Sequence, residues 1–273
     1  MSEVKVNKIS PRSGTTLTIG DSGDTVTIPS GVTLAPGGDL TLTGALTVDG
    51  ASATIKLDGN YPTGSANVAL GNTALDSLTS GNENTAVGNE ALTANTSGCY
   101  NVAIGRSSVK CNTTGCSNTA VGMFTVATNT TGSSNTGLGR NALRANTTAS
   151  NNTAVGFSSL CANTTGTTNV AVGTQALCSN VTGSCNTAIG QEAGSKHTAT
   201  NLTAVGYLAG ACNTSGISNT VIGSQAGKNN TTGCRNVAIG NQSLIFNTTG
   251  VENTALGQNA LYCNTTADYN TAV

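Results

Sequence analysis

The sequence contains no tryptophan, its aromatic residues amount to 3%, and only 8% of its 273 residues are charged. A single large core needs bulky side chains, so this inventory argues against an ordinary globular domain of this length. Basic and acidic residues nearly cancel, to a formal net charge of -1. That balance gives no electrostatic footprint for nucleic acid, and none for an anionic membrane surface.

Long apolar runs are also missing. No segment approaches the roughly 20 apolar residues that span a membrane, and the opening Met1-Ser2-Glu3-Val4-Lys5-Val6 carries charges where a signal peptide needs an apolar run. We therefore expect the chain to be made in a cytoplasm. The nine cysteines are odd in number and contain no C-x-x-C pair, which favours small apolar filler over a zinc site.

The chain is instead rich in a repeat. The segment Asn84-Thr85-Ala86-Val87-Gly88 recurs every 17 residues, and counting from Asn67 there are twelve complete units and a fragment, with one shorter unit at 186–201. Positions are numbered from this asparagine. Position 3 is Ala, position 4 is Val, Ile or Leu, position 5 is Gly, position 9 is mostly Leu or Val, position 12 is Asn and position 15 is Gly. A period of this kind must be recognised before domains are counted.

Two units together have the length of a helical repeat, so helices need to be excluded. Glycine at positions 5 and 15 leaves no helix longer than about nine residues, and β-branched residues fill much of the remainder. The repeat therefore predicts an all-β fold, a parallel β-roll or β-solenoid over residues 67–273. We expect each coil to carry one strand at Thr-Ala-Val and a second around Asn-Thr-Thr, with turns at the glycines.

Side-chain alternation assigns faces to the first strand. If position 4 points into the coil, position 2 points the same way and the alanine of position 3 points out. An outward row of alanines would suit close contact with neighbouring chains. The position-9 leucines would complete the interior. The expected contacts with neighbouring chains are Ala86, Ala103, Ala120, Ala154, Ala171 and Ala188.

The asparagines of positions 1 and 12 stack one above another in such a coil. Each amide can hydrogen-bond to the next rung, so we predict structural ladders. The expected members are Asn84, Asn101, Asn118, Asn135, Asn152, Asn169 and Asn186 at position 1, with Asn112, Asn129, Asn146 and Asn163 at position 12.

The short unit 186–201 departs from the consensus. His197 replaces an asparagine, Leu202 replaces the next opening asparagine, and position 9 is glycine in three successive units. A narrowing of the coil is the interpretation that we favour. A bend or a bound ion at His197 is the alternative, but no Cys, Asp or Glu stands at matching positions to hold an ion.

Residues 1–66 differ from the repeats. Threonine alternates with aliphatic residues in short runs such as Thr15–Ile19 and Thr25–Ile28, separated by Gly, Pro, Asp and Ser, which is a strand pattern. Strands this short are marginal in one chain, so we expect them to be shared between chains. We assign residues 1–25 to an attachment segment and 26–66 to a β-rich neck.

The segment from Lys5 to Asp21 resembles the start of tail-fibre and related structural proteins of bacteriophages, whose N-terminal end attaches to the virion. The resemblance covers about 30 residues and implies docking to tail or baseplate proteins. The residues that it marks for docking are Val4, Val6, Ile9, Pro11 and Arg12.

The repeats resemble the head repeats of YadA-type trimeric adhesins and the shaft repeats of phage tail fibres. The resemblance rests on the motif N-[TSV]-[AV]-[VIL]-G and covers residues 67–273. It implies a left-handed parallel β-roll in which three identical chains pack side by side. The unit here is a few residues longer than the adhesin unit, so the cross-section of the coil is expected to differ.

Other functions fit less well. A polysaccharide-cleaving tailspike needs paired carboxylates, and the repeats offer only Asp76, Glu83 and Glu90 as near neighbours. There is no Ser-His-Asp arrangement and no phosphate-binding glycine loop. Ice binding is disfavoured because the Thr-Thr pairs are adjacent and point to opposite faces. We predict no enzyme activity, no cofactor and no metal.

The sequence thus predicts a structural or adhesive fibre protein, the virion-proximal part of a phage tail fibre. It would link the particle to a distal receptor-binding tip outside this chain, for attachment to the host cell surface. The chain stops one residue short of an expected glycine, without an atypical capping unit, which suggests a fragment of a longer fibre. A bacterial trimeric adhesin head is the alternative, and a tailspike is a weaker one.

Overall fold

A computed structural model describes residues 65–273, and they form a β-solenoid. Each coil contributes one short strand, where β-branched residues at positions 2 and 4 flank a small residue and the glycine of position 5 ends the strand. The strands are β1 (Val68–Leu70), β2 (Thr85–Val87), β3 (Val102–Ile104), β4 (Thr119–Val121), β5 (Thr136–Leu138), β6 (Thr153–Val155), β7 (Val170–Val172), β8 (Thr187–Ile189), β9 (Thr203–Val205), β10 (Thr220–Ile222), β11 (Val237–Ile239), β12 (Thr254–Leu256) and β13 (Thr271–Ala272).

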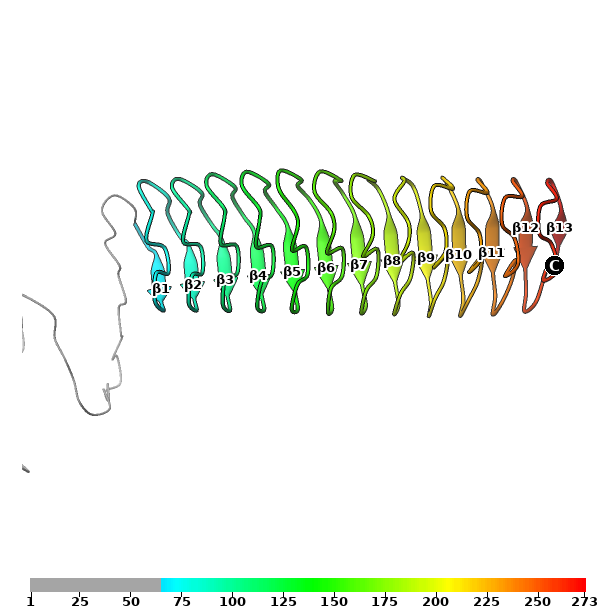
Figure 1. Cartoon of the computed structure of the whole chain (residues 1–273), viewed down its shortest axis with the longest axis horizontal. Coiled ribbons are helices and arrows are strands. Elements are labelled where there is room, and N and C mark those ends of the chain that lie inside the picture. Colours follow the sequence, from blue (N-terminus) through cyan, green and yellow to red (C-terminus); the bar gives the residue numbers. More distant parts are fainter. Residues whose placement is uncertain (1–64) are drawn as a thin grey trace, which may run out of the picture. The chain divides into compact units, whose positions relative to one another are not determined.

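These strands form one parallel sheet whose spatial order is the order of the sequence, β1 to β13 (Figure 1). Equivalent positions pair throughout, for example Ala86 with Ala103 and Ala171 with Ala188. The shorter unit keeps this register, because Ala188 pairs with Ala204. Every side chain of the strand therefore repeats in a straight row along the solenoid.

The expected second strand around Asn-Thr-Thr is absent from residues 65–273. That part of the coil is a series of bends, yet its backbone still bonds to the neighbouring coils. Thr113 N donates to Thr130 O at 2.8 Å and Thr130 N donates to Thr147 O at 2.8 Å, while Leu92 N donates to Ser108 O at 3.1 Å. Coils are thus joined by hydrogen bonds around their circumference without a second sheet.

The prediction that position 4 points inward and alanine points outward is wrong. From Ala86 to Ala255 the position-3 alanines have no exposed surface in a single chain, and neighbouring side chains of positions 2 and 4 are half-buried or exposed. A methyl group fits the narrow interior beside the leucines of position 9, whereas a larger aliphatic chain does not. The alanines that cannot serve as trimer contacts for this reason are Ala86, Ala103, Ala120, Ala154, Ala171 and Ala188.

Four positions of the coil have a left-handed backbone: positions 5, 7, 9 and the last position before the next unit. The glycine of position 5 has a φ between 123° and 137° in every complete coil, a region that L side chains rarely adopt. Position 9 is also left-handed although it carries Leu or Val in most coils; Leu160, with a φ of 49°, is fully buried. The inward direction of the side chain, which closes the core, explains why a non-glycine residue tolerates this conformation.

The repeat units from Asn67 onward lie within the described solenoid. The predicted attachment segment 1–25 and nearly all of the neck 26–66 lie outside the described residues. Within residues 65–273 there is no helix long and apolar enough to cross a membrane.

Candidate functional site

The asparagines of positions 1 and 12 form two hydrogen-bonded ladders inside the solenoid, as their spacing predicted. In the first ladder, Asn101 Nδ2 donates to Asn84 Oδ1 at 3.1 Å, and Asn101 N donates to the same oxygen at 3.0 Å. In the second, Asn112 Nδ2 donates to Asn95 Oδ1 at 2.8 Å and Asn129 Nδ2 donates to Asn112 Oδ1 at 2.8 Å. All of these side chains are fully buried.

The two ladders meet at the carbonyl of position 15. Gly115 O accepts from Asn101 Nδ2 at 2.9 Å and from Asn112 Nδ2 at 2.9 Å. Each coil therefore satisfies its buried amides internally and through its neighbours, which buried polar groups require. Because these bonds are made within the solenoid, we assign the ladder asparagines a structural role.

The ladders are interrupted at the short coil. His197 occupies the place of a position-12 asparagine and is fully buried, with its Nε2 at 3.1 Å from Asn186 Oδ1. Leu202 N donates to the same Asn186 oxygen at 2.8 Å. Asn180 Oδ1 and His197 Nδ1 are left without a hydrogen-bond partner. Burial lowers the pKa of His197 to about 4, so the ring is neutral at pH 7.

The interior of the short coil and of the two coils after it is refilled from other positions. A side chain at Gly194 would place its Cβ 2.8 Å from Leu202 Cδ2, and one at Gly227 would place it 2.6 Å from Val221 Cγ1. Leu202 and Val221 replace the smaller consensus residues of positions 1 and 3. The short unit is therefore less a narrowing of the coil than an exchange of core volume between positions. Residues 65–273 hold no group of three or more His, Cys, Asp or Glu side chains that could bind a metal ion.

An aliphatic stripe runs along the outside of the sheet. It is made by the position-4 residues, which lie in register on successive strands. Seven of them are between 36% and 43% exposed, which is unusual for large aliphatic side chains in one continuous row. They are Leu70, Ile104, Val121, Leu138, Ile189, Ile222 and Leu256.

A cluster of arginines and phenylalanines lies on the turns that follow the strands. The guanidinium carbons of Arg106 and Arg144 lie 5.8 and 6.0 Å from the ring centroid of Phe124, and that of Arg140 lies 5.9 Å from the ring centroid of Phe157. These distances fit cation–π attraction, which holds long side chains against aromatic faces. The three arginines are exposed, and so is Phe157.

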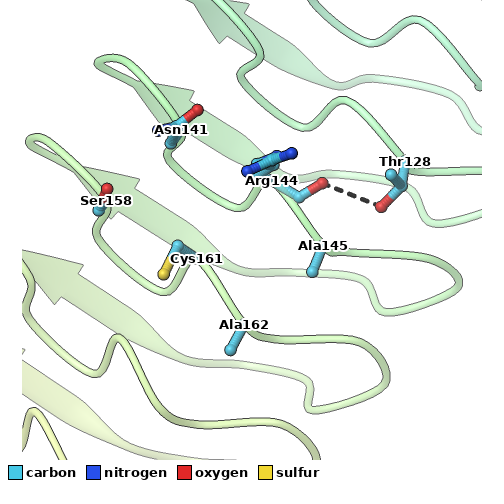
Figure 2. A pocket seen from close by; sticks show the side chains of 7 residues that line it. All are labelled: Thr128, Asn141, Arg144, Ala145, Ser158, Cys161 and Ala162. Carbon is cyan, nitrogen blue, oxygen red and sulfur yellow. Dashed lines mark hydrogen bonds between the residues drawn. The ribbon is translucent and has the colours of Figure 1, made fainter.

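A hollow of about 410 Å³ lies beside this cluster and crosses three consecutive coils. Figure 2 shows Arg144 next to Thr128, whose Oγ1 donates to Arg144 O at 2.9 Å. Asn141 and Ser158 supply further neutral polar groups. The lining residues are Thr128, Asn141, Arg144, Ala145, Ser158, Cys161 and Ala162.

The distribution of charged residues along the sequence could have predicted this cluster, although the repeat is the more prominent pattern. Four basic residues, Arg106, Lys110, Arg140 and Arg144, stand between Glu90 and Glu192 with no Asp or Glu among them. Lys110 Nζ pairs with Glu90 Oε2 at 2.9 Å. Hydrogen bonds from Lys110 and Ser107 lower the pKa of Glu90. In the part of the chain that the structure describes, neither Arg140 nor Arg144 has a carboxylate within 4.0 Å.

All nine cysteines are free thiols, seven of them half-buried and two exposed. Cys161 and Cys178 stack on successive coils, where Cys161 Sγ donates to Cys178 O at 3.4 Å. Burial raises the pKa of both thiols. Protonated thiols in half-buried positions behave as small apolar side chains rather than nucleophiles.

The residues expected to dock to a virion, from Val4 to Arg12, lie outside the described residues. Comparisons of this chain with protein-family models, with curated proteins and with solved structures found no match. The candidate functional features of the solenoid are therefore two parts of its own surface, the aliphatic stripe and the arginine hollow.

Proposed function

We propose that the chain is the rod of a homotrimeric phage tail fibre, in which residues 1–25 attach to tail or baseplate proteins of the virion. A distal region outside this chain would contact the host cell surface. The resemblance of residues 5–21 to the start of phage fibre proteins supports the virion end. The aliphatic stripe supports the association of chains.

The stripe carries the proposal because a single chain leaves it exposed. Parallel strands lie about 4.8 Å apart, so twelve steps give a row about 60 Å long. Isolated surface aliphatics are ordinary, but a continuous row of this length marks an interaction surface. Transfer of such side chains from water stabilises association by about 25 cal/mol per Å² of apolar area.

The periodicity of the stripe favours copies of this chain as its partner. A partner that meets every position-4 side chain must repeat with the same rise, and a parallel copy of the solenoid does so by construction. Closed symmetry then covers the stripe of each chain with that of its neighbours. The contacts of the trimer are thus assigned to position 4, in place of the alanines.

The proposal is tested by adding charge to the stripe. Val121, Leu138 and Val155 lie on adjacent strands and their side chains face outward. Lysines at these three positions can therefore reach water in a single chain without disturbing the interior of the solenoid. We expect this variant to sediment as a folded monomer, whereas the unmodified chain sediments as a trimer. A stripe variant that remains trimeric would overturn the interface.

Matched controls are available off the stripe. Val181 and Ile217 are each 41% exposed, as exposed as the stripe residues, but lie at other positions of the coil. Val181→Lys and Ile217→Lys should leave the trimer intact. If they dissociate it equally, added positive charge rather than the stripe explains the result. Circular dichroism of each variant verifies the fold.

A second function is favoured by the same face. Position 2 also faces outward, so threonine and an aliphatic residue alternate with alanine along most strands, as in Thr153-Ala154-Val155. Flat threonine-bearing rows at solenoid spacing suit an ordered water surface such as ice. These rows are separate from the Thr-Thr pairs, which lie at positions 13 and 14 of the unit. A monomeric chain that produces thermal hysteresis would favour this function over the fibre.

A further inference from the structure

We propose that the hollow beside Arg144 is a binding site for an acidic saccharide, whose carboxylate pairs with the Arg144 guanidinium. The site is contained in one chain, so this inference does not depend on the trimer. In this inference the rod itself contacts a cell-surface polymer. The proposed function assigns contact with the cell surface only to a distal region.

The charge of the site points to an anion. Arg144 lines the hollow, Arg140 lies on the same coil, that of β5, and Arg106 lies two coils earlier and shares the contact with Phe124. Guanidinium groups bind carboxylates through paired, charge-assisted hydrogen bonds. Phe124 fixes two of these side chains through cation–π contacts, which lowers the conformational entropy lost on binding.

The remaining lining points to a sugar. The hollow of about 410 Å³ falls within the range of small-molecule sites, roughly 300–1,000 Å³. Thr128, Asn141 and Ser158 present hydroxyl and amide groups that can exchange hydrogen bonds with sugar hydroxyls (Figure 2). Ala145 and Ala162 supply an apolar part of the lining, against which the C–H face of a pyranose can pack.

A nucleic acid is a weaker match for this surface. The chain has a net charge of -1, and the cationic segment carries four basic residues over about six coils. Binding along a phosphate backbone depends on many such contacts. A discrete hollow with neutral hydrogen-bonding groups suits a short acidic oligosaccharide better.

The test measures binding of an oligogalacturonate hexamer to the full chain by calorimetry, with maltohexaose as the neutral probe and a DNA duplex as the competing polyanion. We expect the acidic hexamer to bind at least tenfold more tightly than the neutral one, with affinity falling as salt rises. Equal affinity for the two hexamers would overturn the proposal. Tighter binding of DNA through the same arginines would overturn the saccharide assignment.

Three variants separate charge from shape. Arg144→Gln should weaken hexamer binding at least tenfold, and Arg140→Gln provides a second measurement should the first variant fail to fold. Ala145→Phe fills the hollow while keeping every charge, so it should also abolish binding. Arg235→Gln is the matched control, because Arg235 is exposed but pairs with Glu252 elsewhere on the solenoid. Loss of binding in Arg235→Gln, or its retention in Ala145→Phe, would contradict a site at the hollow.

Discussion

The regular coils over 84–185 and the irregular coils over 186–235 follow the same backbone path but fill their interiors differently. In the first region, position 9 carries a buried Leu or Val with a left-handed backbone, such as Leu177 with a φ of 49°. In the second, Gly194, Gly210 and Gly227 take this position with φ of 56°, 57° and 55°. Leu202 and Val221 then supply the missing volume from other positions.

The difference shows which features of the repeat are obligatory. A left-handed non-glycine residue costs about 1–2 kcal/mol, and burying a leucine returns about 1.5–3 kcal/mol, so leucine at position 9 is favoured by a narrow margin. Glycine with compensation from a neighbour is therefore an alternative of similar stability. The strand register and the glycine of position 5 are common to both regions.

The largest effect is expected at position 5, where the two regions agree. An alanine at Gly156 would place its Cβ 2.8 Å from the carbonyl of Gly173 and would adopt a φ of 124°. Strain of this kind alone costs about 1–3 kcal/mol, and the clash adds to it, so Gly156→Ala should lower the free energy of unfolding measured in urea by more than about 3 kcal/mol. Gly206→Ala in the irregular region should behave alike.

A matched control exists at position 15. Gly166 occupies this position, where the preceding coil naturally carries Ala149. A Cβ at Gly166 would meet the carbonyl oxygen of Gly183 and Asn163 Oδ1. The preceding coil nevertheless accommodates the Cβ of Ala149 at this position. Because the backbone of Gly166 is not left-handed, Gly166→Ala lacks the strain of Gly156→Ala and should destabilise less. An equal loss in both variants would contradict the special role of position 5.

The next effect is a pH dependence of stability that arises in the irregular region, at His197. Burial holds the pKa of His197 at about 4, below the ordinary value of 6.5. Between these two values the unfolded chain binds a proton that the folded chain does not, so stability is complete above pH 6.5 and falls as the pH drops towards 4. The loss amounts to about 3 kcal/mol. Urea unfolding across this range measures it.

His197→Asn restores the consensus side chain. Because carboxylates also titrate in acid, comparison with this variant separates the contribution of His197 to the loss of stability from theirs. Its stability should lack the component between pH 6.5 and 4. If the variant retains the full acid loss, His197 is not the group responsible.

A smaller effect is expected from the ladders. Asn146 donates to Asn129 Oδ1 at 2.8 Å and accepts from Asn163 at 3.0 Å, so Asn146→Ala leaves buried partners unsatisfied and should cost about 1–3 kcal/mol. Asn180 lies where the ladder ends, and its Oδ1 is already unpartnered. Asn180→Ala should therefore cost less, and the reverse order in thermal unfolding would argue against ladder stabilisation.

The smallest effect is the coupling between Gly227 and Val221. Gly227→Leu alone should be destabilising because its Cβ would lie 2.6 Å from Val221 Cγ1, and Val221→Ala alone removes buried volume. The double variant rebuilds the regular coil. The double variant should lose less free energy of unfolding than the two single variants lose together, by about 0.5–3 kcal/mol. Simple additivity of the two losses would contradict the exchange of core volume.

The sequence was sufficient for the solenoid, the coil boundaries and the ladders, because all three follow directly from a fixed period. It was misleading about the face of the strand. Alternation places Ala86 opposite Thr85 and Val87 but does not say which side is inside, and hydrophobicity favoured valine. The interior is too narrow for valine beside Leu92, so the smaller residue is buried.

The second strand was overpredicted because threonine has β propensity, whereas Thr113 and Thr130 use the same backbone bonds in a bend. The arginine hollow lay beyond any periodic argument. Thr128, Arg144 and Cys161 occupy neighbouring coils, and their common surface depends on side-chain lengths that differ from coil to coil. Non-repeating residues of a repeat protein are where such a site has to be sought.

The most direct test of the account is the solution mass of the full chain, measured by light scattering over a dilution series. A mass near three times 26.9 kDa is the result that the trimeric fibre with its buried aliphatic stripe predicts. A folded chain that remains at 26.9 kDa over the whole series would contradict both the trimer and the assignment of the stripe.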